Sequence, residues 1–96
     1  MAGRDNRVII VTGASRGLGR MIALRFGAAG ARIAVNYLAR QNDALAVADS
    51  ITNQGGEALP LQADVRRETM VDAMIDAVVK RWGTVDVLVT HAGITG

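Results

Sequence analysis

A glycine-rich turn between a short apolar run and an amphipathic stretch constrains the fold of this chain more than any other feature. The apolar run is Val-Ile-Ile-Val at residues 8–11, and residues 12–19 read Thr-Gly-Ala-Ser-Arg-Gly-Leu-Gly. A β-branched run that ends at a glycine predicts a buried strand. Leu18, Ile22 and Phe26 then recur at every fourth position, which predicts one apolar face of a helix. The glycine-rich turn therefore connects a strand to a helix.

Each glycine of this turn has a physical role in binding a dinucleotide. Gly13 lets the chain turn sharply off the strand, Gly17 lets the backbone approach a pyrophosphate, and Gly19 lets the helix pack closely on the sheet. The N–H groups at the start of the helix then face the phosphates, helped by the helix dipole. A glycine loop without a ligand is the alternative. We predict that the turn binds a nucleotide through Gly13, Ala14, Ser15, Arg16, Gly17, Leu18 and Gly19.

The remainder of the chain alternates between strand and helix patterns. Further strands are predicted at residues 33–35, 58–63 and 85–89, and helices at 44–51 and 71–78. Short connections between alternating elements imply parallel strands joined by right-handed crossovers. We expect an α/β fold, a Rossmann-type doubly wound parallel sheet with the pattern β-α-β-α-β-α-β and strand order 3-2-1-4. It is expected to be a single domain over residues 1–96 that corresponds to the N-terminal half of a six-stranded fold.

Composition and charge exclude several classes of protein. The chain has 50% hydrophobic and only 3% aromatic residues, which suits strands buried on both faces. It has no cysteine and one histidine, so we predict neither a disulfide nor a metal site. It has 11 Lys and Arg against 9 Asp and Glu, and the arginines are scattered along the chain. A nucleic-acid site needs basic residues clustered on one face, so we expect no nucleic-acid partner. With no signal peptide and no apolar stretch of membrane-spanning length, we expect no membrane association and a cytoplasmic protein.

The motifs resemble those of the short-chain dehydrogenase/reductase family along the whole chain. The glycine-rich turn matches the family signature Thr-Gly-x-x-x-Gly-x-Gly. Asp64-Val65, after the third predicted strand, is similar to the family's adenine-binding pair. Ala92-Gly93, after the fourth, is similar to the end of its Asn-Asn-Ala-Gly motif. The resemblance implies a nicotinamide-dependent oxidoreductase, with nucleotide contacts at Asp64, Val65, Thr90, Ala92 and Gly93.

Within that family, residues 11–20, 81–83 and 92–95 are most similar to those of the 3-oxoacyl-acyl-carrier-protein reductases of fatty acid synthesis. The resemblance implies reduction of a β-keto thioester of acyl-carrier-protein or CoA by NADPH. In this family, acid–base catalysis is carried out by a Ser, a Tyr-x-x-x-Lys motif and usually an Asn. Here Tyr37 is followed by Gln41 at the fourth position, and Lys80 has no tyrosine before it. We assign no catalytic residue, and we expect the 96-residue chain by itself to be inactive.

Charges near the second predicted strand favour NADP(H) over NAD(H). An NAD site places a carboxylate at the end of that strand to accept from the ribose 2′-hydroxyl. That position holds Asn36, followed by Tyr37, and no acid appears before Asp43. Arg16 in the turn and Arg40 beyond the strand suit a 2′-phosphate instead, because a guanidinium forms charge-assisted hydrogen bonds with it. Of the two arginines, we favour Arg16, and we include Asn36 and Tyr37 among the cofactor contacts.

Thr90-His91 departs from the family, which has Asn at both positions. The Thr90 hydroxyl can replace part of the missing amide, whereas His91 is bulkier. We interpret His91 as structural because one histidine makes no metal site.

Two other classes of function stay open for this chain: a non-catalytic nucleotide-binding or structural module, and an epimerase on the same fold. We also expect a homo-oligomer, because the strand at 85–89 would expose an unpaired edge at which a second copy could pair.

Overall fold

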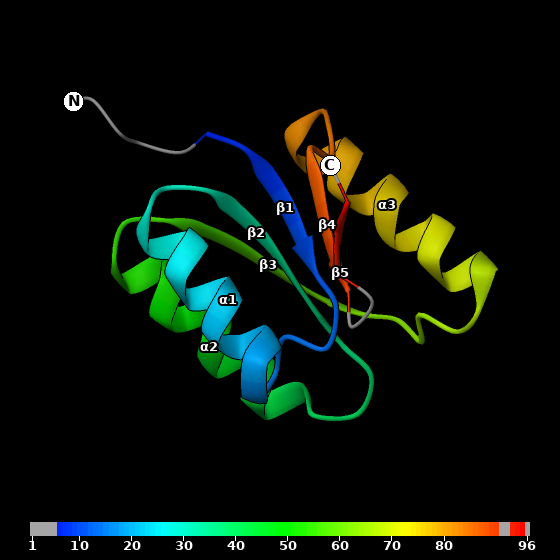
Figure 1. Ribbon diagram of the computed structural model, residues 1–96, viewed down its shortest axis with the longest axis horizontal. Coiled ribbons are helices and arrows are strands. Elements are labelled where there is room, and N and C mark those ends of the chain that lie inside the picture. Colours follow the sequence, from blue (N-terminus) through cyan, green and yellow to red (C-terminus); the bar gives the residue numbers. More distant parts are fainter. Residues whose placement is uncertain (1–5, 91–92, 96) are drawn as a thin grey trace.

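The computed structural model describes residues 6–90 and 93–95 and confirms the predicted alternation of strands and helices (Figure 1). β1, β2, β3 and β4 form a parallel sheet in the order β3-β2-β1-β4, as predicted. The elements in chain order are β1 (Val8–Val11), α1 (Gly17–Ala28), β2 (Arg32–Tyr37), α2 (Gln41–Asn53), β3 (Glu57–Gln62), α3 (Glu68–Trp82), β4 (Val87–Thr90) and β5 (Gly93–Thr95).

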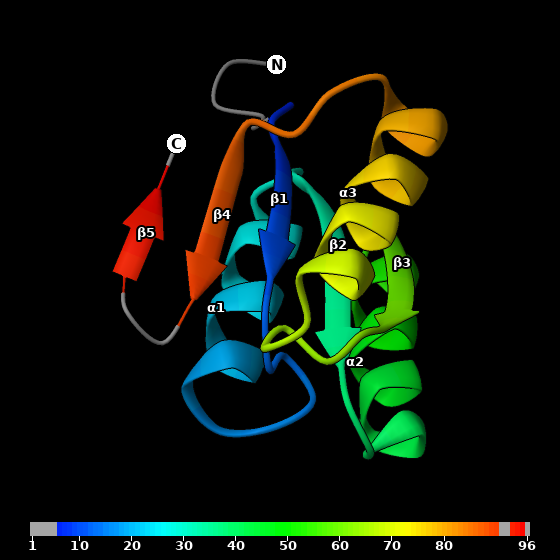
Figure 2. The same cartoon turned by 90° about the vertical axis from the view of Figure 1, so that its right-hand side faces the viewer.

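Helices cover both faces of the sheet, so the described residues form two apolar clusters, one on each face. α1 and α2 lie side by side on one face and α3 lies on the other (Figures 1 and 2). Successive side chains of β1 alternate between the faces. Ile9 and Val11 pack in the cluster under α1 and α2, whereas Val8 and Ile10 pack in the cluster under α3. All four are buried, which is why this strand has no polar position.

The apolar face predicted for the first helix is correct at two of its three residues. Ile22 and Phe26 pack against the core, but Leu18 is 69% exposed and Met21 is 50% exposed. The fully buried residues of α1 are Ala23 and Gly27. Small residues let α1 approach its neighbours closely: a Cβ on Gly27 would meet Ile51 of α2 at 2.8 Å. The larger side chains of the first turn therefore lie outside the core.

A glycine follows each of the three helices α1, α2 and α3. Gly30, Gly55 and Gly83 follow α1, α2 and α3, and all have positive φ angles of 101°, 88° and 87°. Other residues adopt this left-handed conformation at a cost, so glycine is the usual choice after a helix. Among the helices of the described residues, none is both long and apolar enough to cross a membrane.

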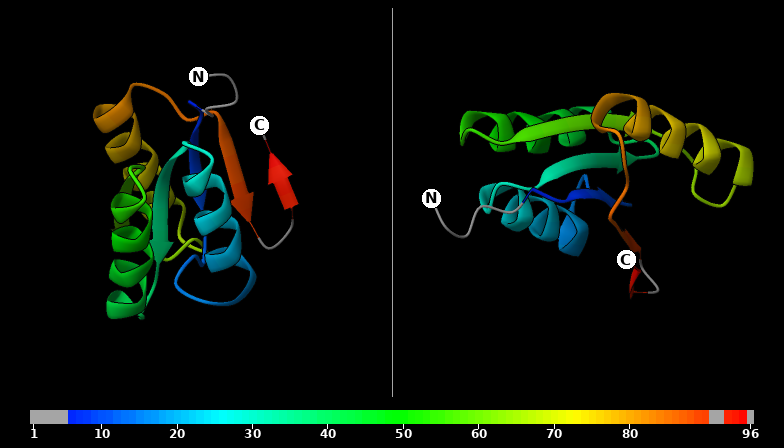
Figure 3. Two further views of the ribbon diagram at one scale, coloured as in Figure 1. Left: turned by 90° about the vertical axis from the view of Figure 1, so that its left-hand side faces the viewer. Right: turned by 90° about the horizontal axis from the view of Figure 1, so that it is seen from above.

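The edge of the sheet differs from the prediction. The outer side of β4 does not stay open, because β5 pairs with it antiparallel, with Thr90 opposite Gly93 and Leu88 opposite Thr95. Figure 3 shows β5 beside β4 at the margin of the sheet farthest from β3. The expectation of an exposed strand at 85–89 is therefore wrong. The antiparallel β5 thus uses backbone groups of β4 that a continuing parallel sheet would pair.

Candidate nucleotide-binding site

A cleft of 420 Å³ opens where the glycine-rich turn leaves the carboxyl end of β1. The ends of β1 and β4 form its floor, and the first turns of α1 form its wall. Figure 2 shows β1 and β4 side by side. This is the edge at which open α/β sheets bind ligands, because the helix N-termini and the loops meet there. The lining residues are Thr12, Gly13, Ser15, Arg16, Gly17, Leu18, Gly19, Ile22, Val89 and Thr90.

The three glycines of the turn differ in backbone conformation and in surroundings. Gly13 and Gly17 have φ angles of 60° and 61°, so both need a residue without a Cβ. Nothing lies within 4 Å of the place where a Gly17 Cβ would point, so the backbone there faces open space. A Cβ on Gly19 would instead lie 3.0 Å from the carbonyl carbon of Gly13 and 3.2 Å from the Cα of Ala14. Gly17 is therefore open to a ligand, and Gly19 lets α1 contact the turn.

The amino end of α1 fits an anionic group. Arg16 is the N-cap residue, in an extended conformation, and no side chain caps the helix. The first turn has no acidic residue, so its free N–H groups and the positive end of the helix dipole face the cleft uncompensated. The exposed Arg16 adds a full positive charge at the same place. A pyrophosphate or a phosphate monoester suits this set of donors.

Asn36 ties the glycine-rich turn to the ends of two strands. Its side chain is buried, with 2% exposed, and its Oδ1 accepts from the Gly13 N–H at 3.2 Å. Its Nδ2 donates to the carbonyl oxygens of Leu61 and Ala63 at 3.3 and 3.2 Å. Its own carbonyl oxygen accepts from the Ala14 N–H at 2.9 Å. Residue 36 therefore holds the turn against β2 and β3.

Asn36 and Tyr37, at the end of β2, are both buried and do not line the cleft. The Asn36 amide makes its three hydrogen bonds within the protein, so its side chain faces inward rather than toward the cleft. Tyr37 is 8% exposed and packs in the apolar cluster with α1 and α2. Neither lines the cleft. Any influence of Asn36 on a nucleotide would pass through the position of the turn that it holds.

Asp64 lies just beyond β3 and is held by Arg66. The Arg66 backbone N–H and Nε donate to Asp64 Oδ1, both at 3.0 Å, and Arg66 Nη2 donates to Oδ2 at 2.9 Å. These hydrogen bonds from Arg66, with the positive charges of Arg66 and Arg67, lower the pKa of Asp64 to about 2. The carboxylate thus stays ionised near neutral pH. Its orientation is fixed, and Oδ2 keeps capacity to accept a further hydrogen bond.

Replacing Arg66 by alanine is expected to raise the pKa of Asp64 from about 2 toward the model-compound value of 3.8, because the Arg66 side chain is the largest cause of the shift. The backbone hydrogen bond remains, so the rise should be partial. A ¹³C NMR titration of the Asp64 carboxyl carbon measures it. Arg67→Ala is the control, since its charge is the smallest cause, and it should leave the midpoint nearly unchanged. An unchanged midpoint in Arg66→Ala would contradict the ion pair.

Because the pKa of Asp64 is lowered in the folded state, its ionised form stabilises the fold. A carboxyl group with a lowered pKa in the folded state stabilises the fold at pH values above its ordinary pKa. That contribution is lost as the pH falls through the folded-state value of about 2. The Asp64–Arg66 pair should therefore add no pH dependence to stability between pH 5 and 8.

Thr12 links the turn to β4. Its backbone N–H and its Oγ1 both donate to the Val89 carbonyl oxygen, at 2.9 and 3.1 Å. This holds the two central strands together directly beneath the cleft. Thr90 lines the cleft next to this link. Of the predicted residues that follow, His91 and Ala92 lie outside the described residues, and Gly93 begins β5.

The structure gathers half of the predicted contact residues in one place. Those that line the cleft are Gly13, Ser15, Arg16, Gly17, Leu18, Gly19 and Thr90. Ala14 is buried beneath the turn, and Asp64 and Val65 lie beyond β3, apart from this lining. The sequence does not predict that Ile22 and Val89 line the cleft, although both do. Both read as core positions in a periodic pattern, and only the three-dimensional course of the turn shows that they also reach the cleft.

A parallel sheet whose first strand leads through a glycine turn into a helix N-terminus defines a dinucleotide-binding α/β domain. Residues 7–96 match the family described as short chain dehydrogenase, and the chain belongs to that family. The chain is 47% identical over 90 residues to a 3-oxoacyl-[acyl-carrier-protein] reductase of Staphylococcus epidermidis. That match covers 94% of this chain but only 37% of the relative, so the chain spans little more than a third of its length.

Solved structures of similar fold carry either nicotinamide cofactor. A 7α-hydroxysteroid dehydrogenase complexed with NADH superposes with a TM-score of 0.83 and 34% identity over 88% of this chain and 33% of its own. The landomycin C-6 ketoreductase LanV with bound NADP gives 0.79 and 36%, over 90% of this chain and 38% of its own. Because both cofactors occur on this fold, the choice between them depends on particular side chains.

Proposed function

We propose that this chain is the NADP(H)-binding part of an oxidoreductase that reduces the keto group of a 3-oxoacyl thioester. The observation that carries the cofactor choice is the position of Arg16, exposed on the rim of the cleft beside an uncapped helix N-terminus. At the end of β2 the corresponding carboxylate of an NAD site is absent, since Asn36 and Tyr37 stand there and both are buried. The similarity to a 3-oxoacyl-[acyl-carrier-protein] reductase supports the substrate class.

The residues of the cleft would divide the work of holding this cofactor. The N–H groups at the start of α1 and the open backbone at Gly17 would bind the pyrophosphate. Arg16 would bind the 2′-phosphate through charge-assisted hydrogen bonds. Asp64 would accept from the adenine amino group, and the Val65 N–H would serve a ring nitrogen. When bound, the nicotinamide would supply a hydride, and no residue of this chain is assigned an acid–base role.

Arg16→Ala is expected to lower the affinity for NADPH about ten- to a hundredfold while changing that for NADH far less. The reason is that charge-assisted hydrogen bonds contribute about 1.5–3 kcal/mol, and only NADPH has the phosphate to accept them. Isothermal titration of both cofactors into the wild type and the variant measures the effect. Arg25→Ala removes the same charge from the far end of α1 and serves as the matched control.

Two results would overturn the proposal at different points. Equal affinity of the wild-type chain for the two cofactors would remove the NADP(H) assignment. For the substrate, a protein of the relatives' full length should oxidise NADPH in the presence of an acetoacetyl thioester. A failure of that reaction alone would leave the cofactor assignment in place and remove the substrate class.

A further inference from the structure

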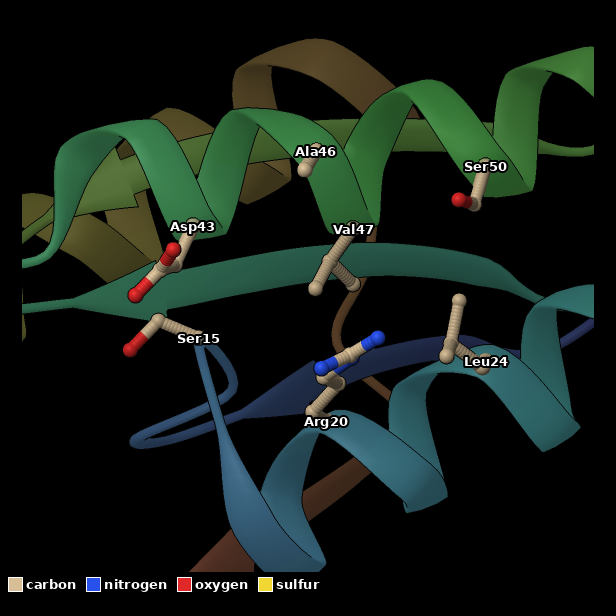
Figure 4. A pocket seen from close by; sticks show the side chains of 7 residues that line it. All are labelled: Ser15, Arg20, Leu24, Asp43, Ala46, Val47 and Ser50. Carbon is tan, nitrogen blue, oxygen red and sulfur yellow. The ribbon is translucent and has the colours of Figure 1, made fainter.

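A second, smaller cavity of 240 Å³ lies between α1 and α2, outside the cleft that the proposed function uses. Figure 4 shows its side chains: Ser15 and Asp43 lie at one end, Leu24 and Ser50 at the other, and Arg20 extends from α1 between them. The lining residues are Ser15, Arg20, Leu24, Asp43, Ala46, Val47 and Ser50. We call this cavity the interhelical groove.

The interhelical groove adjoins the nucleotide cleft through Ser15. Ser15 lines both cavities, so they meet at this residue. It belongs to the glycine-rich turn, directly before Arg16, the residue proposed to meet the 2′-phosphate. Arg20 follows Arg16 by four residues, which is about one turn of helix. A group bound at Ser15 would therefore adjoin both linings, the one with Arg16 and the one with Arg20.

The charges around the interhelical groove suit an anion. The Arg20 side chain makes no hydrogen bond or ion pair with any residue in the described ranges, and it is exposed. Asp43, the one acid of the lining, already accepts from Arg40 Nη1 at 3.0 Å. Together Arg20, Arg40 and Asp43 leave one positive charge in excess. A guanidinium with unused donors next to a serine hydroxyl fits a phosphate monoester.

We propose that Arg20 is a second ligand of the 2′-phosphate, which it reaches past Ser15 from the interhelical groove. Arg16 and Arg20 then contact the phosphate from two sides, and the Ser15 hydroxyl donates between them. This proposal rests on the proposed function, because it needs a cofactor that carries the phosphate. It also gives Asp43 a role: its negative charge lies close to the phosphate and weakens binding, to the extent that Arg40 does not neutralise it.

The rival explanation is that Arg20 serves only to hold α1 against α2 through the charge of Asp43. The two explanations predict opposite effects of Asp43→Asn. If Arg20 acts through Asp43, removing the carboxylate should weaken binding as Arg20→Ala does. If Arg20 binds phosphate, removing a nearby like charge should strengthen binding, because the phosphate no longer meets a negative group.

The experiment compares 2′,5′-ADP with 5′-AMP, which lacks the 2′-phosphate, by isothermal titration into the full chain. Arg20→Ala is expected to lower affinity for 2′,5′-ADP about five- to tenfold and to leave 5′-AMP unchanged. Asp43→Asn should raise affinity for 2′,5′-ADP about two- to fivefold. Both effects should shrink at 1 M salt, which screens exposed charges. Arg25→Ala, the same change on α1 away from the interhelical groove, should change neither.

Each outcome bears on one proposal or the other. Equal loss for 2′,5′-ADP and 5′-AMP in Arg20→Ala, or weaker binding in Asp43→Asn, would assign Arg20 a structural role and overturn this inference. If Arg16→Ala then still lowers affinity for 2′,5′-ADP selectively, the proposed function stands without it. If the wild-type chain binds 2′,5′-ADP no better than 5′-AMP, the proposed function fails and this inference fails with it.

Discussion

Gly19→Ala is expected to weaken nucleotide binding by this chain strongly and to lower its stability. The new methyl group would lie 3.0 Å from the Gly13 carbonyl carbon and 3.2 Å from the Ala14 Cα. Backbone atoms cannot give way as a flexible side chain can, so either α1 or the turn must move. Overpacking of this kind costs about 1–3 kcal/mol. Because the same turn carries Gly17 and the helix N-terminus, its displacement should also lower nucleotide affinity more than about tenfold.

A matched substitution on the same helix separates the two effects. Gly27→Ala also adds a methyl group to α1 at a crowded place, but the atoms it meets belong to the Ile51 side chain, the nearest at 2.8 Å. That side chain can shift, and the position is about two turns beyond Gly19 on α1. Gly27→Ala should therefore lower the thermal midpoint while leaving nucleotide affinity unchanged. Similar affinity loss in both variants would show that general destabilisation, and not the position of the turn, is the cause.

The order of the elements could be predicted because it depends on local patterns. A β-branched run, a glycine with positive φ and an amphipathic helix are each determined by neighbouring residues, and their alternation allows few topologies. The roles of Gly13, Gly17 and Gly19 follow from the same logic. Each role concerns the backbone within a few residues, where the identity of the residue decides what conformation is accessible.

What could not be predicted depends on contacts between distant segments. β5 pairs with β4 through backbone groups, which have no signature in the side chains. Leu18 and Met21 fit the helical period, yet small residues set how α1 packs and leave both exposed. The environment of Asn36 requires Gly13, Leu61 and Ala63 to meet, and these are at least 23 residues away in sequence. For such residues the sequence indicates a neighbourhood but not the direction of a side chain.

Asn36→Asp, the change that would introduce an acid at the end of β2, is expected to destabilise the chain strongly rather than convert it to NAD(H). The Asn36 Nδ2 donates to two carbonyl oxygens at 3.2 and 3.3 Å, and an ionised carboxylate has no hydrogen to donate to either. The side chain is 2% exposed, so the new charge would lie buried against two oxygens. A buried charge without a partner costs about 3–5 kcal/mol, a large fraction of the stability of a small domain.

The pH dependence of this variant tests the mechanism. Burial and the facing carbonyl oxygens should raise the pKa of the new carboxyl group in the folded state above its unfolded value. The penalty is then smallest below the unfolded value, about 3.9, and grows as the pH rises toward the folded-state pKa. The deficit relative to wild type should therefore shrink as the pH falls from 7 to 5, measured by urea unfolding followed by circular dichroism.

Asn42→Asp makes the same chemical change at an exposed position in the first turn of α2, where an acid interacts favourably with the helix dipole. Its effect should stay within about 0.5 kcal/mol and show no such recovery at low pH. If Asn36→Asp were as stable as wild type at pH 7 and bound NADH tightly, the side chain of residue 36 would have to turn toward the cleft. The hydrogen bonds of Asn36 to Leu61 and Ala63 would then not determine its direction.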